Sequence, residues 1–206
     1  MTDKEKKLSR YRAKRNSDTS PEPDDTADGY DWADGGPIFV IQKHAASSLH
    51  YDFRIEVDGV LKSWAIPKGP STDPGEKRLA IPTEDHPLSY ANFEGVIPED
   101  NYGAGTVLLW DRGRYDNLKS AEENDDQAAS VAEQVNDGHV TIRLHGQKLE
   151  GGYALIRTDN GDHERWLLIK MDDDAADARR NPTSTENKSV LSDRSMDEIR
   201  QEEAES

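Results

Sequence analysis

Two histidines and a carboxylate lie close together in the sequence and have the residue types of a metal site. His50, Asp52 and Arg54 are spaced two residues apart, and His44 precedes them. Alternate residues of a β-strand point to the same face, so these three form a polar row between apolar neighbours. A short connection can return the His44 imidazole beside His50. Two imidazoles and a carboxylate predict a site for manganese, iron, nickel or zinc, with surface polar residues on an amphipathic strand as the alternative.

Cationic side chains provide a second signal. Arg54 and Arg78 have guanidinium groups that can donate in pairs to phosphate oxygens, and Lys68 lies in the turn at 64–70. Lysines around a turn are more often solvated charge. Because Arg54 must lie beside the predicted metal ligands, we expect it to neutralise a phosphate that the metal also contacts.

His86 lies where a strand gives way to a loop, and Pro87 follows it. The pKa range of an imidazole suits a general acid or a hydrogen-bond donor to phosphate, and a surface loop histidine is the alternative. His139, His145 and His163 lie outside any recognisable pattern, so we assign them structural or surface roles.

Short apolar runs separated by turn signals must position these side chains. Strands are predicted at 38–41, 50–57, 60–66, 78–81, 106–110, 139–144, 152–157 and 165–170, with turns at Asp58-Gly59 and Arg112-Gly113. Helices are predicted at 5–15 and at 120–136, the second ending at Gly138. Many short strands with regular turns indicate a mainly β sandwich or barrel.

Length and composition indicate one domain with tails. Only 33% of the 206 residues are hydrophobic, and they concentrate after residue 36. We expect a partly ordered arm at 1–36, a β-domain at 37–171 and an acidic, disordered tail at 172–206.

Charge and missing residue types limit the functional classes. The net charge of −16 argues against nucleic-acid binding unless a local basic site outweighs it. The acid can lie on solvated tails or reflect adaptation to high internal salt. The absence of cysteine excludes disulfides, zinc ribbons and thiol catalysis. Neither a signal peptide nor an apolar stretch of roughly 18 residues is visible, which predicts a soluble, cytoplasmic protein.

Several motifs follow one another in a fixed order. They are FVIQKH at 39–44, LHYDFR at 49–54, LKSWAIPKGP at 61–70, EDHP at 84–87, FEGVIP at 93–98, YGAGT at 102–106 and WDRG at 110–113. Together they resemble the 3′-phosphoesterase domain of bacterial and archaeal DNA ligase D over about residues 11–170.

This resemblance implies a small closed β-barrel of about eight strands with one or two flanking helices and disordered termini. It implies a manganese ion on the counterparts of His44, His50 and Asp52. It also implies a set of residues around the phosphate and, on the N-terminal arm, two that assist the first reaction step. The phosphate set is Arg54, Arg78, His86 and Tyr90, with Gln42 and Lys68 nearby; the arm residues are Arg15 and Glu22.

The family acts in two steps on DNA or primer-template 3′ ends during end joining. A phosphodiesterase step removes a terminal ribonucleoside, and a phosphomonoesterase step then leaves a 3′-OH. Two positions depart from the family pattern. Asn16 bears on the first step, and Ser47-Ser48 bear on DNA affinity because they remove positive charge next to the metal. We expect a monomer that is either a stand-alone phosphoesterase or a fragment. A stand-alone protein would need a separate ligase and polymerase as functional partners. The alternatives are a non-catalytic DNA-end-binding module and a cupin-like metal-dependent enzyme acting on small molecules.

Overall fold

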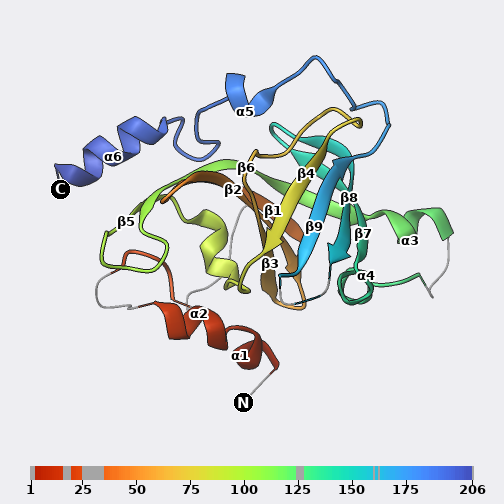
Figure 1. Ribbon diagram of the computed structural model, residues 1–206, viewed down its shortest axis with the longest axis horizontal. Helices are drawn as coiled ribbons and strands as arrows, with labels where there is room; N and C mark the ends of the chain where they lie inside the picture. Colours follow the sequence, from red (N-terminus) through yellow and green to blue (C-terminus); the bar gives the residue numbers. More distant parts are fainter. Residues whose placement is uncertain are drawn as a thin grey trace.

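Nine antiparallel strands dominate the computed structural model (Figure 1), which describes residues 3–15, 20–24, 35–123, 128–159, 161 and 163–205. The strands are β1 (Ile38–Ala45), β2 (Leu49–Val57), β3 (Val60–Ile66), β4 (Lys77–Pro82), β5 (Gly95–Ile97), β6 (Gly105–Asn117), β7 (His139–Gly146), β8 (Glu150–Asp159) and β9 (Arg165–Lys170).

Eight of these strands form a closed barrel. The strand order is β1-β2-β3-β4-β9-β8-β7-β6, and pairing of β1 with β6 closes the ring. The ninth strand, β5, pairs with β6 outside the ring. The predicted mainly β fold with a barrel of about eight strands is confirmed.

Short helices flank the barrel. They are α1 (Asp3–Lys7), α2 (Ser9–Lys14), the 3-10 helix η1 (Leu88–Asn92), α3 (Leu118–Glu123), α4 (Val131–Asp137), α5 (Pro182–Thr185) and α6 (Met196–Ala204). None of the helices in the described ranges is long and apolar enough to cross a membrane.

Both predicted helices are divided in the structure. The helix expected at 5–15 is α1 followed by α2, with Leu8 fully buried between them. The single helix expected at 120–136 is wrong, because α3 and α4 occupy that range. A reciprocal capping box between Ser130 and Glu133 starts α4 as a separate helix, and Gly138 ends it in the left-handed region as predicted.

The two predicted turns differ in outcome. Asp58 and Gly59 have φ values of 49° and 76° and join β2 to β3, so this hairpin turn is confirmed. The turn expected at Arg112-Gly113 is wrong, because β6 continues to Asn117. A Cβ at Gly113 would lie 1.9 Å from the His145 carbonyl oxygen, so this glycine serves close approach of β6 to β7.

Two apolar layers lie on opposite faces of the barrel wall. The inner layer includes Phe39 and Ile41, while Ile38 and Val40 of the same strand pack in an outer layer against Tyr90. The N-terminal arm and η1 contribute to that outer layer. Asp52 and Arg54 on the outer face of β2 are buried, whereas His50 on the same face is half-buried.

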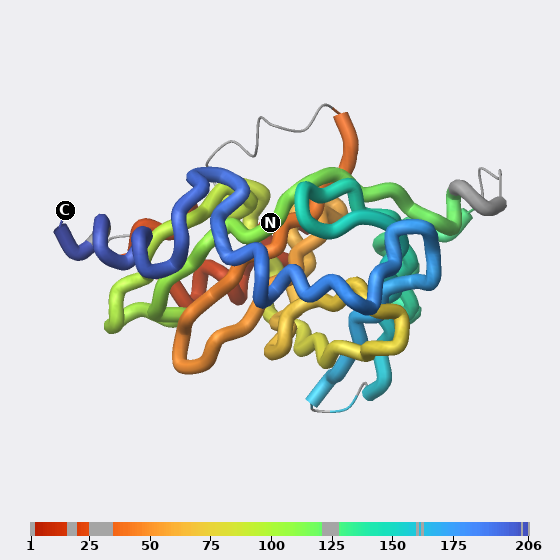
Figure 2. Tube along the Cα trace, turned by 90° about the horizontal axis from the view of Figure 1, so that it is seen from above, coloured from red at the N-terminus to blue at the C-terminus, as the bar shows by residue number. Residues whose placement is uncertain are grey.

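The C-terminal segment runs along the barrel (Figure 2). Trp110 Nε1 donates to the Glu186 carbonyl over 2.7 Å, Tyr51 donates to the Thr183 carbonyl over 3.1 Å, and Ile199 is fully buried. Two hydrogen bonds to backbone carbonyls and one buried apolar side chain thus hold the segment against the barrel. The division into arm, domain and tail stays a prediction.

Candidate metal centre

The β1–β2 hairpin brings the predicted metal ligands together. His44 pairs directly with His50 across the two strands, and Gln42 pairs with Asp52. The two imidazole centroids lie 4.8 Å apart. The apolar residues between the polar ones, including Phe53, point into the barrel core. The alternation read from the sequence therefore gives the correct faces.

His44, His50 and Asp52, here called the triad, have the spacing of metal ligands. Asp52 Oδ2 lies 3.6 Å from His44 Nδ1, and Asp52 Oδ1 lies 3.7 Å from His50 Nε2. One ligand atom from each residue lies within 4.8 Å of the others. Two ligands bound at 2.1 Å around a tetrahedral ion would be about 3.4 Å apart. The triad could therefore hold a metal ion.

Hydrogen bonds fix which imidazole nitrogens face inward. His44 Nε2 lies 2.8 Å from the Gly103 carbonyl, and His50 Nδ1 lies 3.0 Å from the Ser48 carbonyl. A carbonyl only accepts, so these nitrogens donate and the lone pairs of His44 Nδ1 and His50 Nε2 face Asp52. Such orientation by backbone carbonyls is typical of metal-bound histidines.

Arg54 is buried beside the triad, with 3% of its surface exposed. Its guanidinium donates to Gln42 Oε1 over 2.7 Å, to Ser63 Oγ over 2.9 Å and to Asp52 Oδ2 over 3.1 Å. Burial opposes ionisation of Asp52, but the positive charge beside it, above all that of Arg54, outweighs burial and holds the pKa of Asp52 below its ordinary value. Asp52 is therefore a carboxylate at neutral pH.

Gln42 positions the arginine rather than facing an open site. It is fully buried, and its side-chain amide donates to the carbonyls of Tyr90 and Phe93 over 3.1 and 2.9 Å. Its oxygen is left to accept from Arg54 Nε. Gln42 thus links the guanidinium to the end of η1.

His86 lies between two guanidinium groups. Its Nε2 lies 3.1 Å from Arg15 Nη2, and its Nδ1 lies 2.9 Å from both Arg54 Nη1 and the Glu84 carbonyl. Guanidinium only donates and a carbonyl only accepts, so with its proton on Nδ1 the imidazole accepts from Arg15 at Nε2 and donates to the Glu84 carbonyl. In this tautomer Arg54 Nη1 donates to Ser63 Oγ and not to Nδ1. Burial, then Arg54 and Arg15, lowers the pKa of His86 well below 6.5. The imidazole is therefore neutral at neutral pH.

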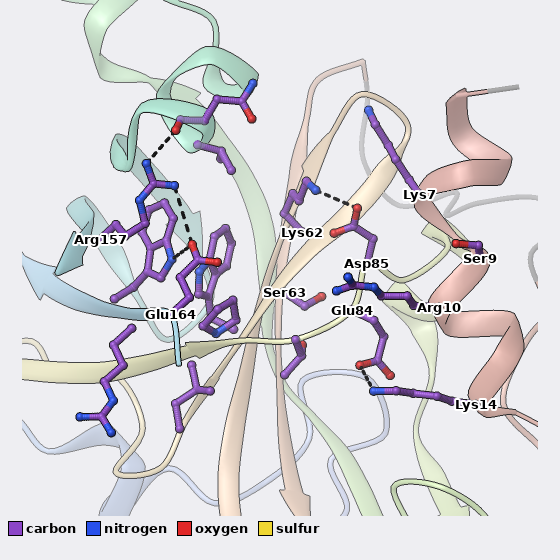
Figure 3. A pocket seen from close by; sticks show the side chains of 18 of the residues that line it. Lys7, Ser9, Arg10, Lys14, Lys62, Ser63, Glu84, Asp85, Arg157 and Glu164 are labelled. Atoms are coloured by element: carbon purple, nitrogen blue, oxygen red, sulfur yellow. Dashed lines mark hydrogen bonds and ion pairs between the residues drawn. The ribbon is translucent and has the colours of Figure 1, made fainter. Parts of the chain in front are cut away.

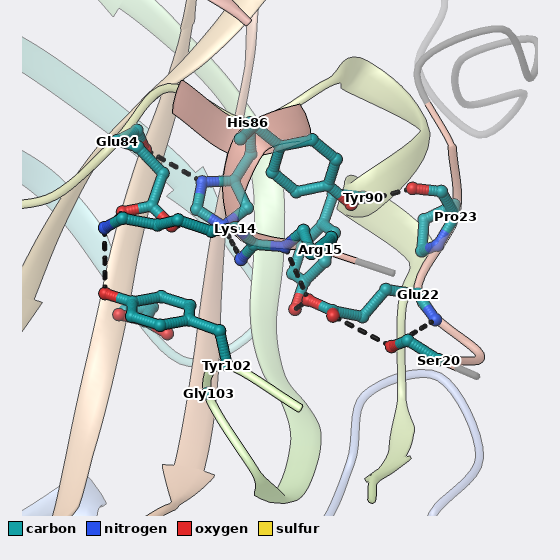
Figure 4. A network of polar contacts seen from close by, with 12 residues as sticks. Lys14, Arg15, Ser20, Glu22, Pro23, Glu84, His86, Tyr90, Tyr102 and Gly103 are labelled. Carbon is teal, nitrogen blue, oxygen red and sulfur yellow. Dashed lines mark hydrogen bonds and ion pairs between the residues drawn. The ribbon is translucent and has the colours of Figure 1, made fainter. Parts of the chain in front are cut away.

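The N-terminal arm reaches this pocket (Figure 4). Arg15 donates to Glu22 Oε1 over 3.0 Å and to Glu84 Oε1 over 2.8 Å, and Lys14 donates to Glu84 Oε2 over 3.0 Å. Tyr90 donates its hydroxyl to Glu22 over 3.0 Å. Burial and the Glu22 carboxylate raise the pKa of Tyr90 well above its ordinary value, so the hydroxyl keeps its proton.

Two of the expected phosphate-binding residues, Arg78 and Lys68, make no polar contact with the triad in the described part of the chain. Arg78, on β4, pairs with Glu76 at 2.5 Å, and Lys68 is exposed after β3. Within the described ranges, the recorded polar contacts of these two residues do not reach the triad. Their roles at the phosphate stay predictions. Asn16 lies outside the described residues.

Sequence reasoning missed the contributions of three residues. Glu84 joins the arm to the pocket, and its position two residues before His86 was an available signal. Ser63 accepts from Arg54, and the Gly103 carbonyl orients His44. A backbone carbonyl leaves no side-chain pattern, so Gly103 could not be found from residue types.

The fold and site define a class of β-barrel protein with a candidate metal centre next to a buried arginine and histidine. Residues 42–157 match the sequence model of the family described as the DNA ligase D 3′-phosphoesterase domain. This chain therefore belongs to that family, and the resemblance seen in its motifs is confirmed.

Curated relatives are similar over most of this chain. The multifunctional non-homologous end joining protein LigD of Pseudomonas aeruginosa is 44% identical over 93% of this chain and 22% of its own length. The multifunctional non-homologous end joining DNA repair protein LigD of Mycobacterium tuberculosis is 49% identical over 80% of this chain and 20% of its own. The chain thus spans about a fifth of the length of these relatives.

Proposed function

We propose that this chain is a manganese-dependent phosphoesterase that repairs DNA 3′ ends for non-homologous end joining. The observation that supports it most is the sharing of Asp52 between the triad and Arg54, whose Nη2 lies 3.1 Å from the carboxylate. A cation and a guanidinium on one carboxylate would both face the same bound phosphate. Family membership supports the phosphoesterase reaction, and the names of the relatives support the role in end joining.

The first step would be hydrolysis of a phosphodiester. Water adds to the phosphorus that joins the penultimate nucleotide to a terminal ribonucleoside, and the bond to the 5′-oxygen of that ribonucleoside breaks. The water gives up a proton and the leaving oxygen gains one, so a 3′-phosphate and a free ribonucleoside result. In the second step another water displaces the 3′-oxygen, which yields a 3′-OH and inorganic phosphate.

His44, His50 and Asp52 would hold the metal ion. When bound, a divalent ion supplies Lewis-acid polarisation of a phosphate oxygen and lowers the pKa of bound water. Manganese is the proposed ion because the nitrogen and oxygen donor set suits it, as it also suits iron, nickel and zinc.

The other residues of the pocket would bind and orient the phosphate. Arg54 stabilises the negative charge that develops on the phosphate oxygens, fixed in place by Gln42 and Ser63. We assign His86 a positioning role, because a neutral imidazole that accepts from Arg15 has no extra proton to give. Arg15 and Glu22 would assist the first step, as only that substrate has a terminal ribonucleoside to contact.

A primer-template with two terminal ribonucleotides and a 5′ label tests the proposal. With manganese, the purified chain is expected to shorten the primer to a 3′-phosphate and then to a 3′-OH, and chelator should stop both steps. Asp116→Ala is the matched control, because Asp116 forms an exposed pair with His145 away from the triad.

Three outcomes would overturn the proposal. Equal turnover with and without chelator would show that the reaction needs no metal ion. DNA binding without turnover that survives both chelator and loss of His86 would indicate an end-binding module. Hydrolysis of small phosphate esters with no effect on the primer would indicate a small-molecule enzyme. A separate ligase and polymerase as functional partners, and a monomeric state, belong to the same proposal.

A further inference from the structure

A cleft of about 930 Å³ is lined by residues other than the triad (Figure 3). Its floor is formed by β3 and β4, for example by Ser63 and Ile81. Helices α1 and α2 form one wall, and residues of α4, β8 and β9 form the other. The cleft is therefore built from segments that are far apart in the sequence.

The lining of this cleft is cationic, unlike the chain as a whole. Cationic side chains outnumber carboxylates there although the chain has a net charge of −16. The cations are Lys6, Lys7, Arg10, Lys14, Lys62, Arg157 and Arg165, and the carboxylates are Glu84, Asp85 and Glu164. Such a local excess in an acidic protein indicates an anionic partner.

Two of these cations have charge available for a partner. Arg10 extends from α2 into the cleft, and Arg165 belongs to β9 on the opposite wall. Both are exposed, and neither side chain makes an ion pair with a residue in the described ranges. By contrast, Lys62 pairs with Asp85 at 2.8 Å and Lys14 with Glu84 at 3.0 Å.

The cleft begins next to the candidate metal centre. Tyr102 lines it with 51% of its surface exposed, and the adjacent Gly103 accepts from the triad residue His44. Ser63 and Glu84 also line it and contact Arg54 and Arg15, respectively. A chain that enters the cleft would thus continue from the phosphate pocket, with an exposed aromatic ring at the junction.

We propose that this cleft binds the sugar–phosphate backbone of the DNA next to the reacting 3′ end. Arg10 and Arg165 each neutralise a phosphate from opposite walls, and Tyr102 stacks on a base near the end. The inference rests on the proposed function and deepens it, because it assigns the surface that distinguishes a nucleic-acid end from a small phosphate ester.

Fluorescence anisotropy with a labelled 3′-phosphate primer-template, between 50 and 200 mM salt, tests the assignment. The double substitution Arg10→Glu and Arg165→Glu should weaken binding at least tenfold at low salt. It should also lower the slope of log Kd against log salt by about 1.8, since each phosphate contact contributes roughly 0.9. The matched control is Arg143→Glu with Arg179→Glu, which changes the net charge equally at exposed positions outside the cleft.

The outcomes separate this inference from the proposed function. If the wild-type chain neither binds nor hydrolyses the primer-template, the proposed function fails. Suppose instead that the wild-type chain binds and hydrolyses the primer-template. If the Arg10→Glu, Arg165→Glu variant then has the same Kd and salt slope as the Arg143→Glu, Arg179→Glu control, the cleft assignment is overturned while the function stands. If circular dichroism shows that the Arg10→Glu, Arg165→Glu variant is unfolded, the neutral variant Arg10→Gln, Arg165→Gln replaces it. That variant must show the same reduction in salt slope.

Discussion

Arg54 Nη2 donates to Asp52 Oδ2 over 3.1 Å. The same carboxylate also faces both imidazoles of the triad. The two residues are neighbours on the same face of β2. A change at either one therefore alters the candidate metal centre and the proposed phosphate-binding pocket together.

Replacing the shared carboxylate tests the metal centre directly. Asp52→Asn should weaken manganese binding by more than about 100-fold, because loss of a mere hydrogen-bond partner of a ligand already costs about 10- to 100-fold. Calorimetric titration with manganese measures this without an activity assay. Asp116→Asn should bind manganese like the wild type, and equal weakening in both variants would contradict the assignment of the triad.

The geometry of Arg54 cannot be reproduced by lysine. Arg54→Lys should lower kcat by about 100-fold or more, as expected when a donor worth about 2.7–4 kcal/mol is removed from a developing charge. Arg78→Lys should have a smaller effect, because the recorded side-chain partner of Arg78 is Glu76. Steady-state rates on a 3′-phosphate primer compare the two. A larger loss at Arg78 would show that this residue, and not Arg54, contacts the phosphate.

The arm is expected to matter more for the first step than for the second. Arg15→Ala should slow removal of the terminal ribonucleoside about tenfold more than release of phosphate, a difference of about 1.4 kcal/mol. Single-turnover rates on the two substrates measure each step in the same protein, so the second step is the internal control. Equal slowing of both steps would instead assign Arg15 to the phosphate itself.

Burial of neutral His86 gives stability a pH dependence. The folded state depresses the pKa of His86, so below about pH 6.5 the unfolded state binds a proton that the folded state does not. Stability should therefore fall as pH decreases from 6.5, by up to about 1.4 kcal/mol per pH unit from this group. Thermal unfolding in chelator between pH 5 and 8 measures the slope. His86→Gln should reduce it, and an unchanged slope would contradict the account.

Packing of the C-terminal segment can be tested at its buried residue. Ile199→Ala should reduce the free energy of unfolding by about 2–5 kcal/mol, as is usual for truncating a core side chain. Leu191→Ala, at a position 45% exposed, should cost much less. Urea unfolding of both variants provides the comparison. Equal, small effects would support the disorder that composition predicts for this segment.

Much of the barrel could be predicted because its strands alternate in polarity. The alternation across His50, Asp52 and Arg54 gave the face of each side chain, and Asp58-Gly59 gave the hairpin. The length of β6 could not be predicted, since glycine is a turn signal unless a neighbouring strand needs the space.

Contacts between segments that are distant in the sequence limit how much of the candidate site can be predicted from the sequence. Arg15 and His86 are 71 positions apart, and only the folded arm brings them to 3.1 Å. Periodicity acts within one strand or helix, so it carries no information on such pairs. The motif resemblance, and not spacing, therefore suggested Arg15 and Glu22.

All three triad residues come from one hairpin of adjacent strands, whereas the ring closes only when β1 meets β6 and β4 meets β9. Local pairs of this kind form early in folding, since little chain entropy is lost in bringing them together, and distant strand pairs form late. The ligand set can thus assemble on the nascent chain well before the barrel is complete. A cation present during synthesis would favour the correct β1–β2 register over a slipped one.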